Sequence, residues 1–234
     1  MLAYKDGAAD LAIRLAQRGF LAAPVMHGPD RGEQQDLFSG ASHLKGEFRI
    51  AAELPIALID VSQGLQEKGA PFQGLLYPGL KLSADGPKVL EFNARFGDPE
   101  TQVYMRLLAT DPLEIFNACV DGRLDQINIQ WREGYAACVV MASQGYPSPD
   151  YLKGVPITGI EDAELLPDVF VFHAGTALDK EGKLVTAGGR VLGVTGFGPT
   201  LQEAIYRAYA GVRLIHFDGM QYRRDIGATS FGQR

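Results

Sequence analysis

Residues 89–102 read VLEFNARFGDPETQ, and this stretch carries the most specific pattern in the chain. Apolar and polar residues alternate through its first half, which predicts a β-strand. Successive side chains of a strand point to opposite faces, so we expect Glu91, Asn93 and Arg95 on one face. A carboxylate, an amide and a guanidinium would then lie side by side.

The chemistry of this set suggests a site for a metal ion and a phosphate. Glu91 and Asn93 offer hard oxygen ligands, which suit Mg²⁺ bound to nucleotide phosphates. Arg95 can stabilise a transferred phosphoryl group or clamp a carboxylate. Gly97 lets the backbone approach a ligand, and Asp98 is expected at a helix start, where free N–H groups favour anions. The alternative is an ordinary strand whose polar side chains face water, and the pattern alone leaves both interpretations open.

This strand is predicted to form a hairpin with the strand that precedes it. Segments 74–82 and 88–96 both read as strands. Asp85-Gly86 lies between them and is a strong signal for a hairpin turn. The two strands are therefore expected to be antiparallel neighbours.

Two short helices are predicted after the strand. The first spans residues 98–108, with Asp98 as its cap and Pro99 in its first turn. The second spans 112–121 and ends at Gly122.

The remaining sequence predicts helices near the N-terminus and short strands near the C-terminus. Helices are expected at 8–18 and at 48–69, with a short strand at 20–25 and a loop over 27–46. After Asp125 the sequence pattern changes to short apolar segments separated by Gly, Pro and Asp. Strands are expected at 127–131, 135–143, 170–178, 183–189 and 190–198, followed by a helix at about 199–214.

Composition limits the functional classes. The 234 residues are 46% hydrophobic and 21% charged, as in ordinary globular proteins, and the net charge of -6 argues against a nucleic-acid-binding surface. No apolar run reaches the ~18 residues that span a bilayer. Cys119 and Cys138 form no metal-binding pair and are expected to be buried free thiols in a cytoplasmic protein.

The spacing Glu91-x-Asn93-x-Arg95 resembles the signature of ATP-grasp carboxylate–amine ligases. The longer run around it is similar to the phosphoribosylamine–glycine ligase family in particular. The resemblance implies that Glu91 and Asn93 hold Mg²⁺ or Mn²⁺ against the phosphates of ATP, the co-substrate. It also implies that Arg95, Gly97 and Asp98 lie beside the glycine and acyl-phosphate site, with catalytic roles for Arg95 and Asp98.

The resemblance extends over about residues 73–227, through landmarks such as FHAGT, TAGGRVLGVTG and YRRDIG. Arg190 follows Gly188-Gly189 in one of these landmarks. It is a candidate for reaching the active site from the C-terminal domain, towards a substrate phosphate. The alternative is a solvated arginine that follows a turn.

The fold implied by the resemblance is α+β, the distal part of an ATP-grasp domain followed by a small β-rich C-terminal domain. Residues 1–48 are unassigned, 49–125 form the ATP-grasp part and 126–234 the C-terminal domain. The implied reaction joins glycine to 5-phosphoribosylamine with ATP and gives glycinamide ribonucleotide in purine biosynthesis.

The family's upstream landmarks, including the nucleotide lid, are not recognisable in residues 1–52, and Lys45 has no phosphate-loop context. We therefore expect little ligase activity from this chain alone, and a second chain that supplies the lid is one possibility. A non-catalytic remnant is an alternative. Another ATP-grasp carboxylate–amine ligase is a further alternative, against which the runs FGDPETQ and YRRDIG argue.

Three further features are expected to be structural. His173 lies between apolar neighbours and is predicted to be a packing histidine. Arg223, Arg224 and Asp225 are predicted to form an ion-pair cluster. Trp131 is predicted to pack in a core or an interface.

Overall fold

The computed structural model describes residues 21–22, 25–27, 64–83 and 86–227. The chain divides into two compact units. Residues 98–107 and 133–227 form what we call the C-terminal unit, and the remaining described residues form the hairpin unit. The domain boundaries predicted from the sequence stay a prediction.

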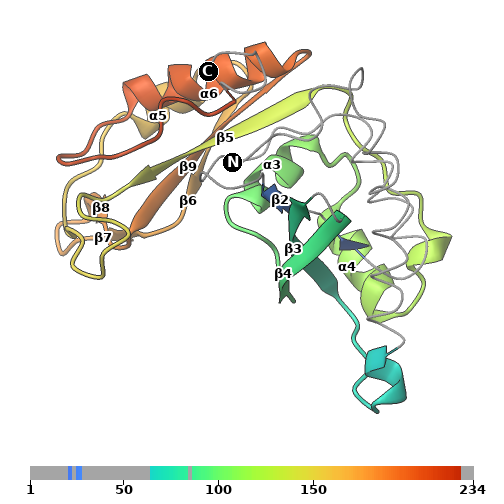
Figure 1. Cartoon of the computed structure of the whole chain (residues 1–234). Helices are drawn as coiled ribbons and strands as arrows, with labels where there is room; N and C mark the ends of the chain where they lie inside the picture. The colour runs from blue at the N-terminus through green and yellow to red at the C-terminus, as the bar shows by residue number, and fades with distance from the viewer. Residues whose placement is uncertain (1–20, 23–24, 28–63, 84–85, 228–234) are drawn as a thin grey trace. The chain divides into compact units, whose positions relative to one another are not determined.

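The hairpin unit is built on β3 (Leu75–Ser83) and β4 (Gly86–Asn93), which Figure 1 draws as adjacent strands. The two strands pair antiparallel with a register shift between Gly79 and Leu80, so the predicted hairpin is confirmed. β1 (Leu21–Ala22) and β2 (Val25–His27) pair in parallel with β3, a pairing that the sequence did not predict.

Helices of the hairpin unit end and begin where the sequence predicts. Residues 64–67 are helical and the chain then turns at Gly69, which has a φ of 72°. α4 (Pro112–Val120) begins after Asp111, whose side chain accepts a hydrogen bond of 2.8 Å from the Leu113 N–H. The helix packs into a small core with Leu124 and Ile129, and Trp131 lies against this core as predicted.

The predicted strand at 127–131 is wrong. The chain forms a single 3-10 turn at Leu124–Gln126 and then runs extended, with only an isolated bridge between Leu108 and Trp131. The apolar side chains of Ile127 and Ile129 pack against the small core. The alternating spacing of these two residues therefore reflects burial against the core and not pairing in a sheet. A short apolar run does not distinguish the two.

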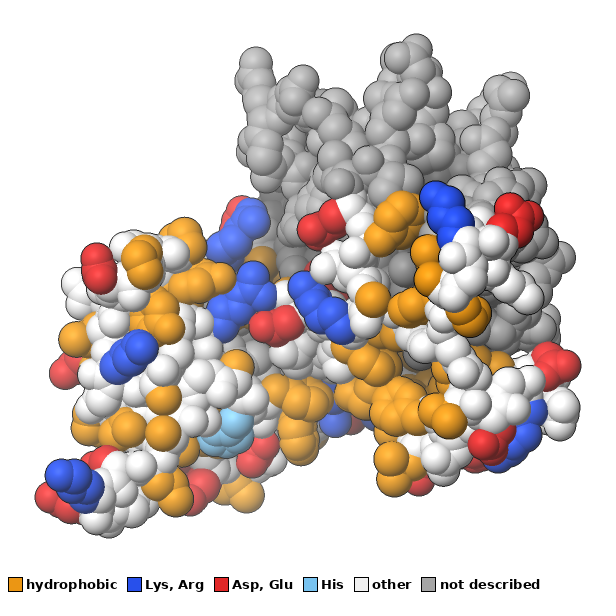
Figure 2. All heavy atoms as spheres, turned by 90° about the horizontal axis from the view of Figure 1, so that it is seen from below, with side chains coloured by type: hydrophobic (Ala, Val, Ile, Leu, Met, Phe, Trp, Pro, Cys, Tyr) orange, Lys and Arg blue, Asp and Glu red, His pale blue; other side chains and the backbone are white. Residues whose placement is uncertain are grey.

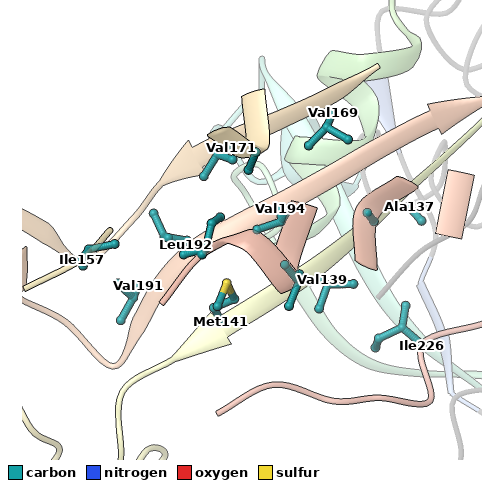
Figure 3. Close-up of a cluster of buried hydrophobic side chains, with 14 of the residues drawn as sticks. Ala137, Val139, Met141, Ile157, Val169, Val171, Val191, Leu192, Val194 and Ile226 are labelled. Carbon is teal, nitrogen blue, oxygen red and sulfur yellow. The ribbon is translucent and has the colours of Figure 1, made fainter. Parts of the chain in front are cut away.

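The C-terminal unit is a three-stranded antiparallel sheet covered by a helix. Its strands, in spatial order, are β5 (Tyr135–Ala142), β9 (Arg190–Gly198) and β6 (Val169–His173). α6 (Leu201–Leu214) packs on β5 and β9. Aliphatic side chains of the sheet form the core between these layers (Figure 3), including Val139, Met141, Val171, Leu192 and Val194. The strands predicted at 135–143, 183–189 and 190–198 and the final helix are confirmed. The single strand predicted at 170–178 is wrong, because the chain forms two strands there, β6 and a second one over Thr176–Leu178, in different sheets.

Glycine allows α6 to approach the sheet closely. A Cβ atom on Gly196 of β9 would lie 2.3 Å from the carbonyl oxygen of Ala204 and 2.5 Å from the amide nitrogen of Ala208. Both of those atoms belong to the α6 backbone. The helix therefore rests directly on the strand, a contact that a larger residue at this position would prevent.

Three smaller elements complete the C-terminal unit. They are α3 (Glu100–Leu107), α5 (Ile160–Glu164) and the hairpin of β7 (Thr176–Leu178) with β8 (Leu184–Thr186). α3 packs against β5 and β9, and α5 packs against α6 and β6. The sequence did not predict α5, which is only five residues long.

Several expectations lie outside the described residues, namely the helix at 8–18, the helix at 48–69 before residue 64, and Lys45. The loop predicted at 27–46 lies outside them too, except for His27, which is the last residue of β2 and not a loop residue. Among the residues that are described, none forms a helix long and apolar enough to cross a membrane. On the face seen in Figure 2, basic side chains lie among acidic and apolar ones, in keeping with the mildly negative net charge.

Candidate functional site

Glu91 and Asn93 lie at the end of β4 and contact each other. The Asn93 Nδ2 donates a hydrogen bond of 3.0 Å to the Glu91 Oε1. This contact requires both side chains on the same face of the strand, as the alternating pattern predicted. Glu91 is exposed and Asn93 is half-buried, so their oxygens are accessible to a ligand.

Arg95 does not continue this face as a strand residue. β4 ends at Asn93, and residues 94–95 form a bend in which the Arg95 Nη1 donates a 3.0 Å hydrogen bond to the Phe96 carbonyl oxygen. The Phe96 ring packs edge-on against Phe116 of α4, with ring centroids 5.6 Å apart. This tertiary contact accompanies the departure of the chain from the sheet, so the prediction of a three-residue strand face was wrong in its last member.

Gly97 and Asp98 follow this bend. Gly97 is buried, and α3 begins at Glu100, two residues after the predicted start at position 98. One oxygen of the Asp98 carboxylate, Oδ1, accepts a hydrogen bond of 2.8 Å from the Gln102 Nε2. The other oxygen, Oδ2, lies 3.2 Å from the Arg190 Nη1. The carboxylate is therefore held at both oxygens.

Arg190, the first residue of β9, reaches Asp98 across 92 positions of sequence. Its Nη1 also donates to the Asp98 carbonyl oxygen, and its Nε donates a 3.0 Å hydrogen bond to the Tyr146 hydroxyl. The guanidinium carbon lies 6.0 Å from the centre of the Tyr146 ring. Arg190 is thus held by protein groups and is not simply solvated, while its role in substrate binding stays a prediction.

The two glycines before Arg190 create this arrangement. A Cβ atom on Gly189 would lie 2.3 Å from the Tyr146 Cδ2, and one on Gly188 would lie 2.8 Å from the Gly175 Cα. We call this close passage of Gly188 and Gly189 past Gly175 and Tyr146 the glycine crossing. Ser143 also holds it, because its N–H donates to the Gly189 carbonyl and its hydroxyl donates to the Gly188 carbonyl, both at 2.8 Å. A side chain at position 188 would meet the Gly175 backbone, and one at position 189 would displace the Tyr146 ring.

The charge of Arg190 is stabilised by its neighbours. Burial lowers the pKa of the guanidinium, but the hydrogen bonds and charges of Tyr146 and Asp98 raise it by more. The net pKa is raised, so Arg190 stays cationic even though about three fifths of its side chain is shielded from solvent, with 40% exposed.

Two members of this cluster were missed from the sequence. Gln102 lies four residues after Asp98, the spacing of neighbours on a helix, and this signal could have found it. Tyr146 lies in the Gly145-Tyr146-Pro147 turn, and no local pattern links it to Arg190. Its contact is purely tertiary.

The other predicted residues divide between correct and incorrect expectations. Arg223 and Asp225 form a bidentate ion pair at 3.0 Å and 2.6 Å, as predicted. Arg224 instead lies over the Tyr222 ring, 5.9 Å from its centre. His173 is exposed and its Nδ1 lies 3.1 Å from the Thr176 hydroxyl, so the packing prediction was wrong. It is the last residue of β6, beyond the part of the strand that the core covers.

Both cysteines are free, but only one is fully buried. Cys138 on β5 is buried, and burial raises the pKa of its thiol to about 12. Cys119 on α4 is half-buried, and burial raises the pKa of its thiol as well. Neither thiol is therefore poised as a nucleophile.

Glu91 and Asn93 fit a magnesium-like ion by their chemistry. A carboxylate and an amide oxygen are hard ligands, which such ions prefer. Within the described part of the chain, no cluster of three or more His, Cys, Asp or Glu side chains could hold a metal. The pair would therefore need further ligands, and nucleotide phosphate oxygens are the usual ones for Mg²⁺.

Two family models match the chain, and together they cover more than half of it. The ATP-grasp (A) domain of phosphoribosylglycinamide synthetase matches residues 55–101, which include Glu91, Asn93 and Asp98. The C domain of the same enzyme matches residues 136–229, which include Arg190. The predicted α+β class, with part of an ATP-grasp domain followed by a C-terminal domain, is confirmed.

Individual relatives agree with the family models. Phosphoribosylamine–glycine ligase from Caldanaerobacter subterraneus is 48% identical over 72% of this chain and 39% of its own length. The ligase from Rhodopirellula baltica is 43% identical over 97% of this chain and 51% of its own length. A human relative, the trifunctional purine biosynthetic protein adenosine-3, is 51% identical over 70% of this chain and 16% of its own length.

A solved structure of phosphoribosylamine–glycine ligase from Thermotoga maritima is also similar. It superimposes with a TM-score of 0.62 and 35% identity over 87% of this chain and 49% of that one. The chain thus spans about half or less of the length of the ligases that it matches.

Proposed function

The chain belongs to the phosphoribosylglycinamide synthetase family, whose C-terminal portion it matches, and on this premise we propose that it supplies metal- and substrate-binding residues for the ATP-dependent ligation of glycine to 5-phosphoribosylamine. In this reaction the glycine carboxylate takes the γ-phosphoryl group of ATP. The amine of phosphoribosylamine then attacks the activated carbonyl, and phosphate leaves. The products are glycinamide ribonucleotide, ADP and phosphate.

The observation that carries this proposal is the contact between Glu91 and Asn93 on one face of β4. The pair lies in the segment that matches the ATP-grasp domain of the family. Glu91 and Asn93 would hold Mg²⁺ or Mn²⁺, which when bound neutralises charge on the phosphates of ATP. Hard oxygen donors favour both ions over softer metals.

The other charged residues of the site have distinct proposed tasks. Arg95 is exposed beside the pair in sequence, and its guanidinium can donate to a phosphoryl or carboxylate oxygen. Asp98 and Arg190 offer one negative and one positive group in a fixed arrangement. Such a pair can bind a substrate that carries both an amine and an anionic group, with the buried backbone of Gly97 beside it in the chain.

The rest of the nucleotide site is proposed to come from residues that match the other half of the ligases. These residues are either joined to this chain or supplied by a second chain, since the relatives are about twice as long as the part that matches. We place the protein in the cytoplasm, in keeping with its two free cysteines.

The test is an assay of glycinamide ribonucleotide formation by this chain combined with the upstream half of the Rhodopirellula baltica ligase. We expect product that depends on ATP, glycine, phosphoribosylamine and a divalent ion. Parallel assays with Mg²⁺ and Mn²⁺ identify the preferred metal. A combination that binds neither Mg-ATP nor Mn-ATP in isothermal titration would contradict the proposal and support a non-catalytic remnant.

Substrate exchange tests the assignment within the superfamily. The same preparation is assayed with other carboxylate and amine substrates in place of glycine and phosphoribosylamine. Faster turnover with another pair would identify a different ATP-grasp ligase.

A further inference from the structure

Tyr146, Arg190, Asp98 and Gln102 form a continuous row of hydrogen bonds in the C-terminal unit. The Arg190 Nε donates to the Tyr146 hydroxyl at 3.0 Å. The Arg190 Nη1 contacts the Asp98 Oδ2 at 3.2 Å, and the Gln102 Nε2 donates to the Asp98 Oδ1 at 2.8 Å. The two charged residues thus have one neutral residue at each end.

We propose that Tyr146 and Gln102 are positioning residues of the ligase site, which act by holding the Asp98–Arg190 pair in one geometry. This inference rests on the proposed function, because it takes Asp98 and Arg190 as residues that meet substrate. Neither Tyr146 nor Gln102 needs to touch substrate itself.

Tyr146 restricts Arg190 in two ways. Its hydroxyl fixes the Nε edge of the guanidinium, and its ring lies beside the planar group, 6.0 Å from the guanidinium carbon. The ring itself is held, because it packs against the bare backbone of Gly189. A long arginine side chain loses much rotational freedom when it binds a ligand, and a prior restraint removes part of that cost.

The second terminal nitrogen of Arg190 is directed to no protein acceptor among the described residues, whereas Nε and Nη1 are both engaged. About 40% of the Arg190 side chain and 48% of the Asp98 side chain remain exposed. The pair is therefore held from within the protein and still accessible to a small polar substrate. This combination is what a preorganised binding group requires.

The hydrogen bonding of the Gln102 amide independently supports its role in positioning Asp98. Its Nε2 donates to Asp98, while its Oε1 is buried and has no hydrogen-bond partner within the described part of the chain. A buried carbonyl without a partner costs stability. The opposite orientation of the amide would place Oε1 against the Asp98 carboxylate, which is repulsive. The contact with Asp98 is thus kept at the expense of an unpaired oxygen.

Methionine at position 102 separates positioning from a purely structural role. Gln102→Met keeps the side-chain length and removes both the bond to Asp98 and the unpaired carbonyl. We expect the chain to be at least as stable in urea unfolding, while kcat/KM of the combined ligase falls about 10-fold. A structural role predicts a loss of stability with unchanged kcat/KM, and this result would overturn the proposal for Gln102.

Tyr146→Phe tests the other end of the row, since it removes only the hydroxyl. We expect kcat/KM to fall about 10-fold in the chain with Arg190 and to change little in the Arg190→Gln background, because Tyr146 acts through Arg190. The matched control is Tyr206→Phe, at an exposed tyrosine of α6 in the same unit, which should leave kcat/KM unchanged. Equal effects of Tyr146→Phe in both backgrounds would overturn the proposal.

A second readout does not depend on turnover. The Arg190 Nε–H proton can be followed through its ¹⁵N-correlated NMR signal in the 234-residue chain. We expect this proton to exchange slowly with solvent and to exchange faster in Tyr146→Phe. Equal exchange in both proteins would overturn the positioning of Arg190 even if the ligase is active. The Arg190 Nε–H could be protected while the unmutated chain, combined with the upstream half of the ligase, makes no product. That result would refute the proposed function, and with it a role of Tyr146 and Gln102 in ligation.

Discussion

The Glu91–Asn93 pair and the Asp98–Arg190 pair are held in opposite ways. Glu91 and Asn93 are two residues apart on one strand and contact each other at 3.0 Å. Asp98 and Arg190 are 92 residues apart, and each has a further protein partner, Gln102 or Tyr146. The first pair depends on strand geometry alone, whereas the second depends on several tertiary contacts.

This difference separates sensitivity to charge from sensitivity to packing. The first pair should respond mainly to changes in its own chemistry, because little else in the protein depends on it. The second pair should respond to changes at neighbours that carry no charge, such as Gly188 and Gly189. Substitutions at each pair, and at a surface ion pair for comparison, test this separation.

The largest effect is expected for Glu91→Gln, which removes a charge proposed to bind the metal ion but keeps the shape of the side chain. We expect kcat/KM of the combined ligase to fall at least about 100-fold, because the charge on the phosphates would be poorly neutralised. The free energy of unfolding in urea should be unchanged, since Glu91 is exposed.

The matched control is Glu181→Gln, at an exposed acid between β7 and β8, which should leave kcat/KM unchanged. A similar loss in both variants would show that the effect is one of general charge. A clear loss of stability in Glu91→Gln would remove the contrast between the two pairs.

Gly188→Ala should disturb the second pair through the backbone. The added Cβ would lie 2.8 Å from the Gly175 Cα, so the two segments must move apart. We expect a loss of about 1–3 kcal/mol in the free energy of unfolding, measured in urea. Gly64→Ala is the control, because its Cβ would meet nothing within 4 Å, and it should be neutral or slightly stabilising. Equal stability of both variants would refute the role of the glycine crossing.

Gly189→Ala should act on the Tyr146 ring and not on the backbone. The nearest atom to its Cβ would be the Tyr146 Cδ2 at 2.3 Å, and a side chain can turn away. We expect a loss of stability of about 1 kcal/mol or less and a fall in kcat/KM close to that of Tyr146→Phe. If kcat/KM is unchanged while Tyr146→Phe is impaired, the ring packing is unimportant and only the hydroxyl matters.

The smallest effect is expected at the Arg223–Asp225 ion pair, which resembles the second pair in charge but lies on the surface. The hydrogen bond from Arg223 lowers the pKa of the Asp225 carboxyl below its ordinary value of 3.8. The stabilisation is therefore present at neutral pH and is lost as the pH falls through the lowered pKa. Because both side chains are more than half exposed, Arg223→Gln should cost about 0.5 kcal/mol or less at neutral pH.

Urea unfolding at neutral pH and at a series of falling pH values measures this difference, which should shrink as the pH falls through the lowered pKa of the Asp225 carboxyl. A loss that persists in acid would mean that Arg223 stabilises the protein by packing and not by charge.

Local patterns predicted most of the secondary structure. The alternation in β4, the hairpin before it and the capped helix α4 follow from contacts between residues close in sequence, and all three were predicted. The strand expected at 127–131 failed, because Ile129 is buried and Ile127 packs half-buried beside it without either residue pairing in a sheet. Burial and strand pairing produce the same apolar spacing in a short segment.

The sequence by itself determined that Glu91 and Asn93 share one face, because the two-residue period of a strand is a local property of the backbone. Only the tertiary structure decided that β4 ends before Arg95 and that Arg190 meets Asp98. The packing of Phe96 against Phe116 accompanies the first, and the close passage of Gly188 and Gly189 past other segments accompanies the second. Neither contact has a period or spacing in sequence, since each joins residues that only folding brings together.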